Sequence, residues 1–279
     1  MGPLFAAKDT GAPSVFRPEN LLREARRQKR VPEGPVPDIC LLDPDGDLLR
    51  ALASAGRTRP SPVWACYHTT LHEFDHAGVR YGVIGCAVGA AFAVLLAEQL
   101  FASGCRLLLS LTSAGQIETA GDPPYFIVID RSLRDEGTSY HYLPPADFAP
   151  APAALAGLAF GALRRAGMAV RQGATWTTDA PFRETEAAIA QARAAGVLAV
   201  EMEAAALYAF AAARGCDVLC LAHVTNRMAQ EEGDFEKGEA NGAAEALAVI
   251  AAITAAWKDI ERKEDKKRAG PEAPRPRSF

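Results

Sequence analysis

Short apolar runs alternate with helix-forming stretches along most of the chain. The runs are rich in Leu, Val and Ile and have the length of buried strands, whereas the stretches between them are rich in Ala, Leu and Glu. We expect strands over residues 39–42, 64–75, 79–86, 107–111, 125–129, 168–173, 197–200 and 218–224. We expect helices over residues 47–55, 90–103, 152–166, 184–195, 204–214 and 242–258. Strands that alternate with helices predict an α/β fold with helices on both faces of the sheet.

The two ends of the chain differ from this pattern. Residues 1–36 carry several prolines and a basic stretch, and residues 21–27 within them fit a short amphipathic helix. We interpret this segment as an extension wrapped on the core or on a neighbouring subunit. Residues 259–279 are dense in charged residues and proline, which predicts a disordered tail. The catalytic domain is therefore expected over residues 37–258.

Composition narrows the class of protein. Of 279 residues, 49% are hydrophobic and 23% charged, and the formal net charge is −4. This balance does not suggest a nucleic-acid surface, and no uncharged apolar run reaches the ~18 residues of a membrane span. The chain start lacks a signal-peptide pattern, and the six cysteines form no Cys-x-x-Cys pair. We expect a cytoplasmic protein with no nucleic-acid or membrane partner.

Two carboxylates, Glu201 and Glu203, flank Met202 where the expected strand 197–200 passes into the expected helix 204–214. Open α/β sheets bind ligands outside the carboxyl ends of their strands. A carboxylate there accepts hydrogen bonds from a vicinal diol such as that of ribose. The alternative is an acidic helix N-terminus, where negative charge is favourable in any protein. Neither a Gly-x-Gly-x-x-Gly sequence nor a Walker loop supports a nicotinamide or nucleoside-triphosphate enzyme.

The Glu-Met-Glu sequence, followed by small residues, resembles the signature of the nucleoside phosphorylase superfamily, which includes purine nucleoside and uridine phosphorylases and related nucleosidases. Residues 107–117, 176–185 and 221–226 resemble three further segments in the order of that family. The resemblance runs from about residue 38 to about residue 257 and is closest to uridine phosphorylase-like members. It implies a three-layer α/β sandwich with a central mixed β-sheet flanked by helices. It also implies a homo-oligomer, because relatives are commonly dimers or hexamers.

The resemblance assigns roles around the sugar and the base. It makes Glu203 the catalytic carboxylate that binds the ribose diol, with Met202 against the ribose and Glu201 as a less certain partner. Arg183 occupies the position of an arginine that binds pyrimidine oxygens and stabilises the leaving base. The family's glutamine is absent here, and we expect Phe182 to stack on the base instead. A surface ion pair of Arg183 with a neighbouring glutamate is the alternative.

The segment after the last expected strand favours a pyrimidine substrate. Purine-cleaving relatives carry an aspartate there, whereas this chain has His223 and Asn226 and no aspartate before Asp234. Asn226 resembles the pyrimidine-specific members. His223 is expected near the substrate, with a hydrogen-bonded position at a strand end as its alternative.

The expected nucleophile site departs from the phosphorylase pattern. Ser113 and Gly115 match the glycine turn that binds phosphate, but the three arginine positions correspond to Gly46, His72 and Ser110. Their loss weakens a charge-assisted phosphate site. Arginines at positions 50, 57, 59 and 80 are candidates to replace the three lost arginines.

Three reactions are therefore open, with no cofactor required for any. The first is phosphorolysis of a pyrimidine nucleoside to free base and ribose 1-phosphate, with inorganic phosphate as co-substrate. The second is phosphate-independent hydrolysis of the same bond. The third is nucleoside binding without turnover.

Histidines at positions 68, 72 and 76 form a row with a spacing of four. Such a row raises the possibility of a metal site, but along a strand neighbouring members lie ~13 Å apart, so we expect no metal. We instead place His72 on the anion or water side of the pocket. The segment 134–142 resembles a family loop that reaches toward the ligand, so that Tyr140 and His141 approach the substrate or pack at a subunit contact.

Overall fold

The computed structural model describes residues 4, 8–228, 232–235 and 237–268. Its strands are β1 (Ile39–Asp43), β2 (Arg59–Pro60), β3 (His72–His76), β4 (Val79–Gly85), β5 (Leu107–Gln116), β6 (Tyr125–Asp135), β7 (Phe148–Pro150), β8 (Val170–Thr178), β9 (Val197–Glu201) and β10 (Asp217–Asn226). Its helices are α1 (Pro18–Lys29), α2 (Asp47–Ser54), α3 (Ala90–Ala102), α4 (Ala153–Arg165), α5 (Glu186–Ala194), α6 (Ala204–Arg214) and α7 (Ala243–Arg268). Short 3₁₀ turns include η2 (Ser139–His141), η3 (Pro181–Arg183) and η4 (Glu239–Gly242).

All strands join one mixed sheet, in the order β10-β6-β8-β9-β5-β1-β4-β3-β2, with β7 paired to β6. Strand β10 also pairs with β5, so the first five strands of this order close on themselves. The remaining strands extend from β5 as an open sheet. Strand β1 runs parallel to β4 and β5, whereas β6 runs antiparallel to β10. The predicted mixed sheet of an α/β fold is confirmed.

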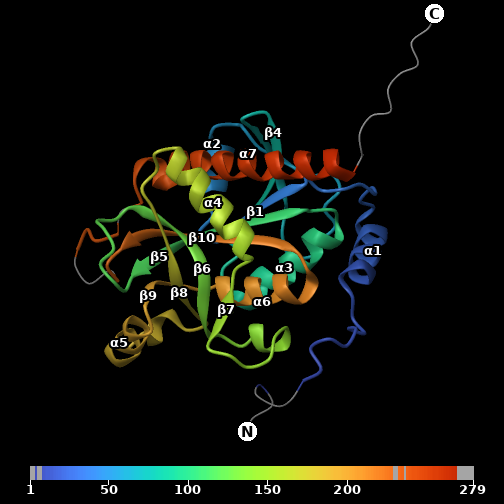
Figure 1. The fold of residues 1–279 in the computed structure, drawn as a ribbon. Coiled ribbons are helices and arrows are strands. Elements are labelled where there is room, and N and C mark those ends of the chain that lie inside the picture. Colours follow the sequence, from blue (N-terminus) through green and yellow to red (C-terminus); the bar gives the residue numbers. More distant parts are fainter. Residues whose placement is uncertain (1–3, 5–7, 229–231, 236, 269–279) are drawn as a thin grey trace, which may run out of the picture.

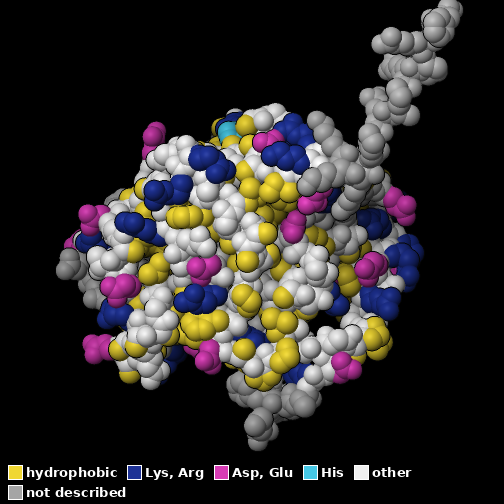
Figure 2. All heavy atoms as spheres, in the orientation of Figure 1, with side chains coloured by type: hydrophobic (Ala, Val, Ile, Leu, Met, Phe, Trp, Pro, Cys, Tyr) yellow, Lys and Arg dark blue, Asp and Glu magenta, His cyan; other side chains and the backbone are white. Residues whose placement is uncertain are grey.

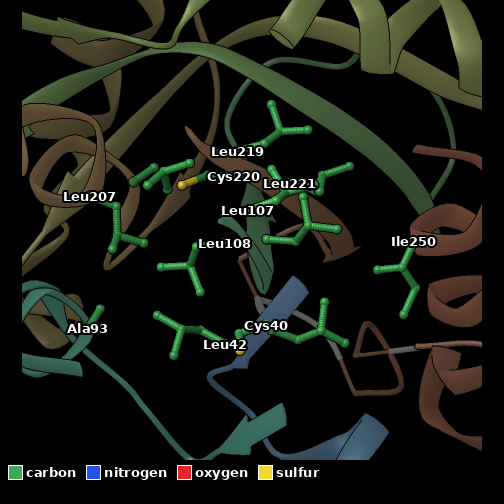
Figure 3. Packing of buried hydrophobic residues seen from close by; sticks show 14 of the residues in the cluster. Cys40, Leu42, Ala93, Leu107, Leu108, Leu207, Leu219, Cys220, Leu221 and Ile250 are labelled. Carbon is green, nitrogen blue, oxygen red and sulfur yellow. The ribbon is translucent and has the colours of Figure 1, made fainter. Parts of the chain in front are cut away.

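Helices cover both faces of the sheet (Figure 1). Helices α3 and α6 pack against each other on one side, and α4 packs against α7 on the other. Figure 3 shows the result in the core, where leucines of β1, β5 and β10 lie between Ala93 and Leu207 on one side and Ile250 on the other. Strands buried on both faces are apolar throughout, and the short apolar runs of the sequence reflect this.

Helix α7 is, among the described residues, the one helix long and apolar enough to cross a membrane. Its side chains Val249, Ile250, Ile253 and Trp257 are buried against the core. That burial is the pattern of a core helix in a folded domain. On the face shown in Figure 2, acidic and basic side chains are interspersed, with small hydrophobic areas between them.

The structure corrects some of the expected strand boundaries and confirms the hairpin between two of the strands. The strand expected from residue 64 begins only at His72, because residues 64–71 form an irregular segment that buries Trp64 and Leu71 as anchors. The hairpin at residues 76–78 is confirmed. Strands β5, β6, β8 and β10 continue beyond their apolar runs into polar residues that line the site.

The ends of the chain were only partly predicted. The amphipathic helix is confirmed as α1, which buries Leu22 and Ala25 beside Ala65. The expectation of disorder from residue 259 is wrong for residues 259–268, because α7 continues to Arg268. Lys, Glu and Arg are good helix formers, so the charged composition extends the helix rather than ending it. Residues 269–279 of the expected tail lie outside the described residues.

Candidate active site

Glu201 ends β9 and is held by five hydrogen-bond donors. Its Oε1 accepts from the hydroxyls of Ser132 (3.1 Å), Thr175 (3.1 Å) and Thr177 (2.5 Å). Its Oε2 accepts from the backbone N–H groups of Glu203 and Ala204, each at 2.7 Å. These two amides open α6, so Glu201 caps that helix from within the preceding strand. These contacts agree with the interpretation of Glu201 as a carboxylate at a helix terminus. Both of its oxygens are occupied by protein donors.

Glu203 sits at the start of α6, with 1% of its surface exposed. Its Oε1 accepts the backbone N–H of Gly89 at 2.7 Å. Its Oε2 is buried and accepts no hydrogen bond within the described part of the chain. Gly89 precedes α3 at a φ of 93°, a conformation that glycine adopts without strain. The loop after β4 therefore fixes one oxygen of Glu203 and leaves the other available.

The two glutamates influence each other's protonation. Burial, followed by the negative charge of Glu201, raises the pKa of Glu203 from 4.5 to about 8. Burial also raises the pKa of Glu201, and the surrounding hydroxyl and amide donors oppose that rise. Because Glu201 has five donors and Glu203 one, we assign the negative charge of the pair to Glu201 at neutral pH. Glu203 then carries the proton.

Ser113 lies on the carboxyl half of β5, and its hydroxyl binds a carboxylate of the protein itself. Its hydroxyl donates to Asp45 in the loop between β1 and α2. Lys237 approaches from the segment before α7 and donates to Asp45 (2.7 Å) and Asp47 (2.5 Å). Asp43 is buried at the end of β1, where burial and the neighbouring Asp45 and Asp47 raise its pKa to about 6.

These residues enclose a cavity of about 40 Å³ next to the carboxyl ends of β1, β5 and β10. We name it the acidic pocket, and its polar members are Asp43, Asp45, Asp47, Thr112, Ser113, His223, Lys237 and Asn241. The register of β10 on β5 sets His223 opposite Ser113. The His223 ring stacks on Phe126 with 4.4 Å between centroids, and burial lowers the pKa of the imidazole. His223 is therefore neutral at pH 7.

Three of the four arginines proposed as substitutes form ion pairs with carboxylates. Arg50 pairs with Asp47 at 2.6 Å on the exposed side of α2. Arg59 and Arg80 both approach Glu73, at 3.3 and 4.0 Å. Within the described residues, the cation closest to the Ser113 position is Lys237. Ser110 is fully buried inside β5, and its hydroxyl has no partner among the described residues.

Asn226 and Gly115 form a second close contact between β10 and β5. Asn226 is buried, accepts the N–H of Met228 at 2.9 Å and donates to Thr225. A Cβ on Gly115 would lie 2.7 Å from the Met228 sulfur and 3.4 Å from the Asn226 Oδ1. Gly115 thus permits the close approach of the turn that follows β10.

Two expected base ligands lie exposed in η3. Phe182 is 99% exposed, and Arg183 is also on the surface. The expected alternative for Arg183, an ion pair with Glu184 or Glu186, is absent from the ion pairs of the described residues. Met202 is half-buried in the bend between β9 and α6. The two residues expected to bind the base are thus exposed to solvent in the single chain.

His72 and Tyr140 do not join the acidic pocket. His72 lies on β3, three strands from β5 in the sheet order, which is on the order of 14 Å. The Tyr140 hydroxyl donates to the Arg134 carbonyl at 3.0 Å, and its ring lies over the Arg134 guanidinium. His68 falls in the irregular segment before β3, so the expected histidine row is not formed along one strand. Within the described residues, no group of three or more potential metal ligands gathers.

The sequence analysis did not identify Gly89 or Lys237. It considered the Asp43–Asp47 loop only because Gly46 replaces an arginine there. The carboxylates at alternate positions 43, 45 and 47 were the available signal, because they lie directly after a predicted strand. Lys237 had no signal, since the fold brings it to Asp45 from 192 residues away along the chain.

Comparison with known proteins shows which family the chain matches. A family profile described as "Phosphorylase superfamily" matches residues 23–256. A DeoD-type purine nucleoside phosphorylase of Myxococcus xanthus (strain DK1622) is 32% identical over 153 residues, which are 54% of this chain and 64% of that relative. The corresponding protein of Bacillus cereus (strain ZK / E33L) is 30% identical over 155 residues, 55% of this chain and 66% of the relative. The chain matches slightly less than two thirds of the length of these relatives.

Solved structures show the shared fold. The crystal structure of uridine phosphorylase from Vibrio fischeri ES114 is similar with a TM-score of 0.65 and 20% identity, covering 80% of this chain and 93% of that one. A second structure of that enzyme, complexed with 6-hydroxy-1-naphthoic acid, has a TM-score of 0.65 and 19% identity. It covers 78% of this chain and 90% of the other.

Proposed function

Because the chain belongs to the phosphorylase superfamily, we propose that it cleaves the N-glycosidic bond of a nucleoside at Glu203. The observation that carries this proposal is the Oε2 atom of Glu203, which is buried and accepts no hydrogen bond from any described residue. Buried polar atoms are normally paired, so this oxygen suits a ligand hydroxyl such as those of ribose. In its ionised form Glu203 stabilises the positive charge that develops on the sugar as the bond breaks.

The base of the proposed substrate is a pyrimidine. Arg183 supports this assignment because a guanidinium beside a pyrimidine oxygen stabilises the leaving anion. Asn226 stands where the resemblance would require an aspartate for a purine, and the exposed Phe182 offers a face for stacking. The purine nucleoside phosphorylases among the relatives support a nucleoside substrate in general.

Two nucleophiles have separate support. The names of the relatives favour phosphorolysis, with inorganic phosphate as co-substrate, ribose 1-phosphate as product and no cofactor. The carboxylates of the acidic pocket favour hydrolysis by water. Nucleoside binding without turnover is the remaining alternative, and it predicts binding with no base release.

We further propose that the protein is a cytoplasmic homo-oligomer. An almost fully exposed Phe182 beside the proposed base ligand Arg183 supports this, because a second copy can cover what one chain leaves open.

A direct assay tests the function. The protein is incubated with uridine, cytidine, adenosine and inosine, with and without phosphate, and base release is followed by chromatography. We expect release from uridine and its near complete loss in Glu203→Gln. Asp75→Asn, an exposed carboxylate on β3, is the matched control and should retain activity. Binding without release from any nucleoside would contradict the proposal.

A further inference from the structure

We propose that a cavity beneath the N-terminal arm, residues 9–21, is a second ligand site. Its ligand is a neutral aromatic compound with an N–H group that donates a hydrogen bond to Gln99. The inference does not depend on the proposed cleavage at Glu203. It gives the N-terminal extension a role in binding.

The cavity lies between the N-terminal arm, helix α3, the η2 turn and the end of α6. In Figure 1 the blue arm runs past α3 and α6. Lys8 and His141 hold the start of the arm to η2, with 3.3 Å between Nζ and Nδ1. The volume of about 320 Å³ falls at the lower end of the roughly 300–1,000 Å³ that small-molecule sites occupy.

This cavity is separate from the site at Glu203. Glu203 binds the Gly89 N–H where α3 and α6 begin, whereas Glu98 and Arg214 line the cavity near the other ends of these helices. Along a helix axis, Glu98 is about 14 Å from Gly89, and Arg214 is about 16 Å from Glu203. A ligand in the cavity is therefore remote from the proposed reaction.

Gln99 provides the observation that points to a ligand. Its side chain lines the cavity from α3 and is 1% exposed. Its Nε2 donates to the Leu95 carbonyl at 3.0 Å, which fixes the orientation of the amide. Its Oε1 is buried and accepts no hydrogen bond from the described residues. Because a buried acceptor without a donor is unfavourable, an N–H group of a ligand would stabilise this arrangement.

The charged side chains of the cavity already have partners. Glu98 Oε1 accepts from the Tyr142 hydroxyl at 3.0 Å and from Arg214 Nη2 at 3.1 Å. Burial and the Glu98 charge raise the pKa of Tyr142, so its hydroxyl remains a donor to that carboxylate. Asp9 is exposed to solvent, and its Oδ1 accepts the Gly11 N–H at 3.1 Å. These contacts favour a neutral ligand over a charged one.

The apolar walls favour an aromatic ring. Phe16 and Leu21 of the arm face Leu95 of α3 and the Tyr142 ring across the cavity. Tyr142 is itself fixed by an edge-on contact with Phe210, with 6.0 Å between ring centroids. Phe16 is 70% exposed and Leu95 is 37% exposed, and a flat apolar ligand between them would bury part of both.

Two probes of similar shape test the hydrogen bond. Indole has an N–H group where benzothiophene has a sulfur, and NMR titration of the full chain gives the Kd of each. We expect a Kd of about 1 mM or tighter for indole. Benzothiophene should bind about tenfold more weakly, because it leaves the Gln99 acceptor without a donor. Equal binding of the two probes, or a Kd for indole weaker than about 10 mM, would overturn the proposal.

Variants test the two walls separately. Gln99→Met removes the acceptor and keeps the length of the side chain, so the preference for indole should disappear. Gln191→Met, at an exposed glutamine on α5, is the matched control and should retain it. Phe16→Ala should weaken both probes about threefold or more. Val15→Ala should weaken neither, because Val15 is 98% exposed and does not line the cavity. A preference that survives in Gln99→Met would overturn the role of Gln99.

Crystals soaked with indole locate the bound ring. We expect it between the N-terminal arm and α3, with its N–H group within hydrogen-bond distance of Gln99 Oε1. Indole found only beside Glu203 would overturn the second site. Binding of indole does not require turnover, so a failure of the proposed nucleoside cleavage leaves this result unchanged.

Discussion

At the scale of single residues, the site depends on two glutamates that share one negative charge. Five donors stabilise the charge on Glu201, and this fixed anion together with burial holds the proton on Glu203. In the proposed reaction, a protonated Glu203 binds the neutral sugar, and its ionised form stabilises the transition state. The pair therefore links catalysis to pH.

Base release should show this link. We expect kcat/KM to rise with pH and to reach a plateau above about 8, the pKa to which burial and Glu201 raise Glu203. Glu201→Gln removes the neighbouring charge, so the midpoint should move to lower pH. The hydroxyls around Oε1 can rotate to accept from the amide, so the variant should fold. A midpoint that does not move in Glu201→Gln would contradict the shared charge, and Asp75→Asn serves as control.

The stability of the fold should depend on the same proton. The pKa of Glu203 in the folded chain, about 8, exceeds the ordinary value of 4.5, so the folded state binds an extra proton between these pH values. Its contribution is fully present below pH 4.5 and is lost as pH rises to 8, by on the order of 5 kcal/mol. Glu203→Gln cannot lose this proton. Urea unfolding at pH 5 and pH 9 should show a smaller decline for the variant, and equal declines would count against the raised pKa.

Arg183 is the residue that separates substrates. If its guanidinium contacts a pyrimidine oxygen, Arg183→Ala should lower kcat/KM for uridine by about tenfold more than for any purine nucleoside that is turned over. Arg171→Ala, an exposed arginine on the same strand-and-turn unit, is the matched control. An equal loss for both bases would remove the support for a pyrimidine.

At the scale of elements, the turn before α7 positions two members of the acidic pocket. Gly242 has a φ of +77°, and a Cβ there would lie 2.5 Å from His223 Cε1 and 2.8 Å from the Lys237 carbonyl. Gly167 has a similar φ of +73° after α4 but open space around it. A comparison of substitutions at the two glycines therefore distinguishes backbone strain from steric contact.

Alanine at each position makes this distinction measurable. Gly167→Ala should cost about 1 kcal/mol through the left-handed backbone alone. Gly242→Ala should cost roughly 3 kcal/mol, because it also displaces His223 or the Lys237 carbonyl, and it should reduce base release. Denaturant unfolding measures both. Equal costs would show that the close approach at Gly242 relaxes without consequence.

Hydrophobic pattern predicted most elements but not the polar ends of the strands. β5 was expected to stop at Leu111, yet it continues through Thr112 and Ser113 to Gln116, because β10 and β9 pair with it there. Such pairing depends on distant segments and leaves no periodic signal. The same holds for Glu201, whose hydroxyl partners come from β6 and β8. Local sequence indicated Glu203 at a strand-to-helix junction, whereas Lys237 required the closed sheet.

At the scale of the whole molecule, the sheet that closes on itself determines which residues meet. The carboxyl ends of the parallel strands β1, β5 and β10 lie at one edge, and the loops after β4 and β9 bring Gly89 and Glu203 there. Glu203 and the acidic pocket are therefore both formed within one chain. The η3 turn, with Phe182 and Arg183, is exposed on the surface of that chain.

The N-terminal extension stands apart from this arrangement. The apolar cluster of α1 consists of Leu22, Ala25 and Ala65 and is separate from the main core cluster. Removing residues 1–30 should therefore cost about 2–4 kcal/mol, the loss of one small cluster, and leave Glu203 in place. We expect a lower Tm with base release within about twofold of wild type. Leu22→Ala in the full chain should lower Tm by a comparable amount, whereas Leu108→Ala in the main core should lower it further. A truncated chain that fails to fold would show that α1 belongs to the catalytic domain rather than extending it.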